Sequence, residues 1–138
     1  MKLTNFDNLQ VEGIILKKSV VGAEVNNAGI ATFTPEQVLS GLILRDPNGA
    51  GRADKLPTAA DLFEAIGGDR VQADGVGVSF EFTIRNTANG AETITVTTNT
   101  GLTLSGTMTI AQNNSKRFLV EFTSKTAAKV YSLGTVVH

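Results

Sequence analysis

Histidine, the most frequent catalytic base, and cysteine, the thiolate ligand, are almost absent from this 138-residue chain. The one histidine, His138, is the last residue, and there is no cysteine. A Ser-His or Cys-His nucleophile would therefore depend on a chain terminus, where fraying works against catalysis. We interpret His138 as a solvated chain end and expect a protein that is not an enzyme. Without cysteine, disulfides and thiolate metal sites are also excluded.

Two groups of acidic residues have spacings that could bind a cation. Asp61 and Glu64 stand three apart in a predicted helix, where carboxylates near the N-terminal half favour the helix dipole, so we assign them a structural role. The stretch DPNGAGRAD, 46–54, resembles a calcium loop in placing Asp, Asn and Asp first, third and ninth. However, Arg52 stands where an oxygen ligand is needed, and no closing glutamate follows. Because Asp-Pro-Asn-Gly is itself a turn sequence, we predict a turn and expect no metal or cofactor.

Two further short motifs are explained by strand entry and turns. Gly75-Val76-Gly77 lacks the following helix that phosphate binding needs, and is typical of a glycine-rich entry into a strand. Asn113-Asn114-Ser115 matches a glycosylation acceptor, but without a secretion signal it is more simply a hairpin loop.

The elements that must position any site are mostly strands. From residue 76 to 137, apolar and polar side chains alternate with period two, which indicates strands with one buried face. The exposed face is rich in threonine, whose branched Cβ favours extended backbone. Turn residues separate the strands at 88–90, 99–101, 112–115 and 124–126. The apolar positions are Phe80, Phe82, Ile84, Ile94, Val96, Leu102, Leu104, Met108, Ile110, Phe118, Val120 and Phe122.

The stretch SFEFTIRNTANGAETITVTT, 79–98, predicts a hairpin closed by the three-residue loop 88–90. This loop length sets Ile84 opposite Ile94 and Phe82 opposite Val96, so that both apolar sets share one face.

Helix signals occur only in the N-terminal half. Thr34, Pro35 and Gln37 form a helix start that predicts a short helix over 35–40, and Thr58 caps a clearer helix near 58–66 that ends at a double glycine. Residues 42–44 predict a short strand, and 46–57 a loop.

The predicted fold class is mainly β: an antiparallel β-sandwich or small barrel, jelly-roll-like or tulip-like, with one short helix near 58–66. Residues 34–138 are predicted to form this single domain, and residues 1–33 an extended N-terminal arm or outer strands. The arm's apolar side chains lack clean alternation, and we expect them to contact a neighbouring protein or subunit. These candidate interface residues are Phe6, Leu9, Val11, Ile14, Ile15 and Leu16.

Charge and hydropathy limit the classes of partner. The formal net charge is −1, with 12 basic and 13 acidic residues and no Lys/Arg-rich block, which argues against nucleic acid. No apolar segment reaches the ~18 residues of a membrane helix, and the N-terminus lacks the apolar run of a signal peptide. We expect neither nucleic acid nor a membrane as partner.

Four stretches carry a resemblance to a known class of proteins: 41–66 (GLILRDPNGAGRADKLPTAADLFEAI), 79–96, 101–123 and 130–138. Together they cover about two-thirds of the chain, and they resemble small virion proteins of tailed bacteriophages, most closely capsid decoration (cement) proteins. The resemblance implies a structural protein made in the host cytoplasm, located on the capsid surface and trimeric, with the major capsid protein as its partner. It brings no catalytic motif. The alternative is a tail or head-fibre domain involved in host attachment.

Overall fold

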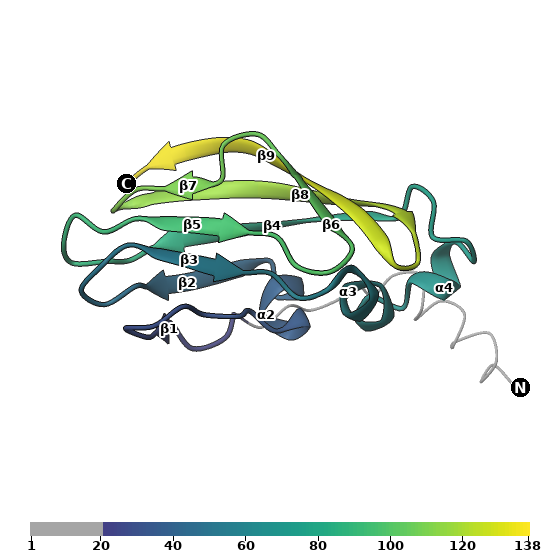
Figure 1. Ribbon diagram of the computed structural model, residues 1–138, viewed down its shortest axis with the longest axis horizontal. Coiled ribbons are helices and arrows are strands. Elements are labelled where there is room, and N and C mark those ends of the chain that lie inside the picture. The colour runs from purple at the N-terminus through teal and green to yellow at the C-terminus, as the bar shows by residue number, and fades with distance from the viewer. Residues whose placement is uncertain (1–20) are drawn as a thin grey trace, which may run out of the picture.

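The protein is a sandwich of two β-sheets with its helices gathered at one end (Figure 1). The computed structural model describes residues 21–138. The larger sheet has six strands in the order β1-β2-β4-β8-β9-β6, and the smaller has three in the order β3-β5-β7. The mainly β fold predicted from the alternating pattern is confirmed.

The strands and helices have the following bounds. The strands of the larger sheet are β1 (Val25–Asn26), β2 (Leu42–Asp46), β4 (Ser79–Asn86), β8 (Asn114–Ser124), β9 (Ala127–Val137) and β6 (Leu102–Ser105). Those of the smaller sheet are β3 (Arg52–Lys55), β5 (Ile94–Thr97) and β7 (Thr109–Ile110). The helices are α2 (Pro35–Leu39), α3 (Ala59–Ala65) and α4 (Gly68–Val71).

Strand directions are mixed, so the expectation of purely antiparallel sheets is wrong. The pairs β1–β2, β2–β4, β3–β5 and β6–β9 are parallel, whereas β4–β8, β8–β9 and β5–β7 are antiparallel. Between β2 and β4 the chain forms β3, α3 and α4, and this long crossover is what allows the two to run parallel. Period-two alternation reports which face of a strand is buried and does not report which strand it pairs with.

The predicted hairpin over 79–98 is also wrong. β4 and β5 lie in different sheets: Ile84 is opposite Lys116 of β8, and Ile94 is opposite Ile110 of β7. Residues between β4 and β5 carry the chain from one sheet to the other. The burial prediction nevertheless holds, because Phe82 and Val96 are each 1% exposed.

The core lies between the two sheets and extends under α3. Phe82 and Phe118 stack with ring centroids 5.2 Å apart, and Phe63 of α3 meets Phe122 edge-on at 5.2 Å. Each such side chain stabilises the fold by roughly 1.5–3 kcal/mol when fully buried. The Phe63–Phe122 pair therefore joins the larger sheet to the helical end, whereas Phe82 and Phe118 stack within that sheet.

Both predicted helix starts are confirmed. Thr34 and Gln37 form a capping box, in which each side chain accepts a hydrogen bond from the other residue's backbone N–H (2.8 and 3.2 Å). Thr58 caps α3 by accepting from the Asp61 N–H at 3.1 Å.

Two elements were not predicted. β3 lies inside the segment expected to be a loop, 46–57, because its four residues pair with β5 across a long sequence separation. α4 follows the double glycine that was expected only to end α3, because Gly67 takes a left-handed conformation and the chain then makes one more helical turn.

Candidate functional site

The six apolar residues predicted to form an interface, Phe6, Leu9, Val11, Ile14, Ile15 and Leu16, lie outside the described residues. The structure does describe the segment that follows them and how it is attached to the sandwich. We therefore build the candidate site from the contacts that hold residues 25–31.

An ion pair buried between the sheets forms the centre of these contacts. Nε of Arg45, on β2, lies 2.6 Å from Oδ2 of Asp54, on β3, and Nη2 lies 3.0 Å from Oδ1. Both side chains are 0% exposed. This two-point geometry matches the planar guanidinium fork to the carboxylate and links one sheet to the other.

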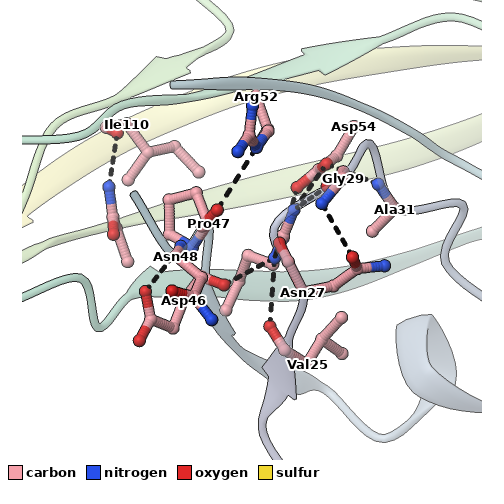
Figure 2. Close-up of polar contacts among 12 residues, drawn as sticks. Val25, Asn27, Gly29, Ala31, Asp46, Pro47, Asn48, Arg52, Asp54 and Ile110 are labelled. Carbon is pink, nitrogen blue, oxygen red and sulfur yellow. Dashed lines mark hydrogen bonds and ion pairs between the residues drawn. The ribbon is translucent and has the colours of Figure 1, made fainter. Parts of the chain in front are cut away.

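The remaining donors of Arg45 bind backbone carbonyls of the N-terminal segment (Figure 2). Nη1 donates to the carbonyls of Val25 (3.2 Å) and Asn27 (2.9 Å), and Nη2 donates to that of Gly29 (2.9 Å). Nη1 also lies 2.6 Å from the carbonyl oxygen of Asp46. We call Arg45 and Asp54, with the backbone they bind, the Arg45 clamp.

Asp54 completes the Arg45 clamp from the other side. Its Oδ1 accepts the Ala31 N–H at 2.8 Å, so the segment is held by both charges. Burying an isolated charge is costly, and the cost is offset only when hydrogen bonds satisfy both ions. Here the folded N-terminal segment supplies those bonds, which makes its position part of the stability of the core.

Residues 47–51 form the predicted turn, whereas Asp46 ends β2 and residues 52–54 belong to β3. Asp46 accepts hydrogen bonds from the Asn48 N–H (2.9 Å) and from the Asn26 side chain (3.2 Å), and Arg52 donates to the Pro47 carbonyl (3.2 Å). The second acidic residue of the calcium-like pattern, Asp54, faces Arg45 instead of the loop. Among residues 21–138, no three or more His, Cys, Asp or Glu side chains gather in a metal-binding arrangement.

The other candidates from the sequence lie apart from this clamp. Asp61 and Glu64 are exposed on α3, with Asp61 in the first turn, where its charge suits the helix dipole. Gly75 and Gly77 precede β4, as expected for a strand entry.

His138 is not simply a solvated chain end. Its Nε2 lies 2.9 Å from the Ser115 hydroxyl oxygen, and its backbone N–H donates to the Asn113 carbonyl at 2.8 Å. A catalytic Ser-His pair also needs a group that orients the imidazole, and no hydrogen bond from another described side chain reaches the ring. The contact fastens the end of β9 to the start of β8. Sequence reasoning missed it because 23 residues separate the partners.

A groove of about 650 Å³ opens at the helical end of the sandwich. Its apolar lining comes from α2, α3, α4 and the start of β4: Leu39, Ala65, Ile66, Val71, Val78 and Phe80. Sequence reasoning found no concave site, because these residues come from four separate elements. Of the described residues that line it, Glu81 alone is charged.

Comparison with known proteins adds no relative. No protein-family model, no curated protein and no solved structure matches the chain. Among residues 21–138, no helix has the length and apolar character needed to cross a bilayer.

Proposed function

We propose that this chain is a non-enzymatic decoration (cement) protein of a tailed-phage head. It binds the outer surface of the expanded shell as a homotrimer and stabilises contacts between major capsid protein subunits. The resemblance of four stretches of the sequence to phage virion proteins gives the function class. The Arg45 clamp is the structural observation that supports it best.

The clamp supports this function through rigidity. A decoration protein must bind a preformed lattice and resist the pressure of packaged DNA, so flexibility at the attachment point costs both affinity and strength. Hydrogen bonds from both buried charges fix residues 25–31, the root of the N-terminal segment, to the two sheets. A force on this segment would therefore pass directly into the core.

Virion composition tests the function class. Purified DNA-filled virions of the phage that encodes the chain should contain it in a copy number comparable to that of the major capsid protein, measured by quantitative mass spectrometry. Empty, unexpanded heads from the same lysate are the control, and they should contain much less. A few copies per virion would contradict decoration and favour the alternative, a tail or head-fibre domain.

A deletion tests the predicted interface. Removing residues 2–16 takes away all six predicted interface side chains and leaves the Arg45 clamp intact. The truncated protein should keep the circular dichroism spectrum and melting transition of the full chain, and should no longer sediment with expanded heads. Unfolding, or unchanged binding, would show that these residues do not form the shell contact.

A further inference from the structure

The last six residues of β9 form a free sheet edge. Residues 128–131 of this strand pair with β6 on one side and β8 on the other, whereas 132–137, among the strands of residues 21–138, pair only with β8. Three apolar side chains are exposed along this stretch: Leu133 (43%), Val136 (59%) and Val137 (75%). Proteins usually protect such edges with charges or proline, and 132–137 contain neither. This edge has the properties of a strand-pairing surface.

The opposite edge of the same sheet is also open. β1 stands first in the strand order, and no described strand pairs with its outer side. Residues 21–30 are exposed except for half-buried Val25. Figure 1 shows β1 at the margin of the sheet, and the C-terminus at the end away from the helices.

The two edges cover the same positions along the strand direction. Val25 pairs with Arg45, which pairs with Asn86. One residue earlier, Arg85 pairs with Ser115, which pairs with Val136. Following these registers across the sheet, Glu24 has the same position along the strand direction as Val136, and Val25 has the same position as Val137.

The two edges also match in direction. β1, β2 and β4 are parallel, and β9 is antiparallel to β8, which is antiparallel to β4. β1 and β9 therefore point the same way. Rotating a copy about an axis parallel to the strands preserves both the position along the strands and the strand direction. Such a rotation can therefore place the β1 strand of one copy beside the β9 strand of the next.

We propose that the free edge of β9, residues 132–137, binds the β1 edge, residues 21–26, of a second copy of this chain. The contact is a parallel, head-to-tail strand pairing, and it rests on the proposed homotrimer, because a head-to-tail contact forms a closed ring of three only when each copy is rotated by a third of a turn. Every copy then donates one edge and accepts the other, which leaves neither open.

Coverage of both edges favours this pairing over contact between two β9 edges. The side chain of Glu24 is held within its own chain, because its carboxylate accepts a hydrogen bond from the Thr87 hydroxyl at 2.6 Å. Arg117 likewise pairs with Glu81 of its own chain at 3.3 Å, so the proposed contact rests on backbone hydrogen bonds and exposed apolar side chains and needs no new ion pair. Pairing of two β9 edges would leave the β1 edge uncovered.

Cross-linking tests the pairing directly, because the natural chain has no cysteine. Neighbouring strands lie about 4.8 Å apart, within the range that a disulfide spans. Glu24→Cys and Val136→Cys proteins, mixed and oxidised, should form a disulfide-linked pair, and the double variant should give covalent species of up to three chains. Each single variant should retain the melting transition of the natural chain. As a matched control, Glu24→Cys mixed with Val76→Cys should stay unlinked, because Val76 is exposed (57%) in the loop leading to β4.

The outcomes separate this inference from the proposed function. Linkage of Val136→Cys to itself would show that β9 edges pair with one another, and would overturn the proposal. A trimer mass by light scattering without Glu24–Val136 linkage would overturn it and leave the homotrimer standing. A monomer mass without linkage would overturn both the pairing and assembly in solution, while virion composition would still decide whether the chain decorates heads. As a second variant, Val136→Lys should abolish the trimer with the melting transition of the monomer unchanged, and retention of the trimer would contradict the proposal.

Discussion

Asp54→Asn is expected to lower the free energy of unfolding by about 3–5 kcal/mol, because removing one partner of a buried ion pair leaves the other charge uncompensated. The amide keeps the size of the carboxylate, so the loss reports the charge and its hydrogen bonds. Arg45 would stay at 0% exposure with no anion beside it. Urea unfolding monitored by circular dichroism measures the change.

Glu81→Gln is the matched control. Glu81 pairs with Arg117 at 3.3 Å, but their side chains are 50% and 63% exposed. Solvent screens such a pair, so its loss should cost about 0–1 kcal/mol. If the two variants lose similar stability, burial does not set the strength of the Arg45–Asp54 pair.

Hydrogen exchange should place the effect of Asp54→Asn on the N-terminal segment. The Ala31 N–H donates to Asp54, and the carbonyls of Val25, Asn27 and Gly29 accept from Arg45. We expect faster exchange at the Ala31 amide under conditions where the β8 amides stay protected. Uniform exchange across both regions would show that the clamp opens only with the whole domain.

Features that depend on neighbouring residues were predictable from the sequence. The caps at Thr34 and Thr58 are local, since each side chain binds a backbone group three residues on. The alternation in 79–98 predicted burial correctly for the same reason, because each side chain's face follows from its place along the strand.

Features that depend on distant partners were not predictable. β4 and β5 are adjacent in the sequence, and their apolar faces meet across the core from different sheets. The pattern of alternation is the same for that arrangement and for a hairpin. β3 was missed because a four-residue strand between turn residues gains its stability from β5, which begins 42 residues after β3 does.

The Arg45 clamp left one signal in the sequence. In Leu42-Ile43-Leu44-Arg45, period two places Arg45 on the same face as Ile43, and that face is buried. An arginine on an apolar face requires an anion, and Asp54 is nine residues away across the predicted turn. That Arg45 also binds the carbonyls of residues 25–29 could not be inferred, because those residues carry no matching pattern.

Gly101→Ala is expected to lower the free energy of unfolding by about 2–5 kcal/mol, combining left-handed strain with overpacking. Gly101 has φ +81°, and an added Cβ would overlap the Thr126 carbonyl oxygen and lie 2.9 Å from the Ala59 Cβ. Three elements meet here: the start of α3, the entry to β6 and the turn between β8 and β9. Backbone cannot move away at one of them without displacing the others, so the clash is not easily relieved.

Gly77→Ala isolates the contribution of that clash. Gly77 has nearly the same φ, +82°, but an added Cβ would meet nothing within 4 Å. This variant should therefore lose only the roughly 1–2 kcal/mol of left-handed strain. Thermal and urea unfolding of the two variants measure the difference, which should be about 1–3 kcal/mol. Equal losses would mean that the Thr126 turn moves freely away from Gly101. In that case the β8–β9 hairpin, whose far end carries the 132–137 edge, would not be held firmly by α3.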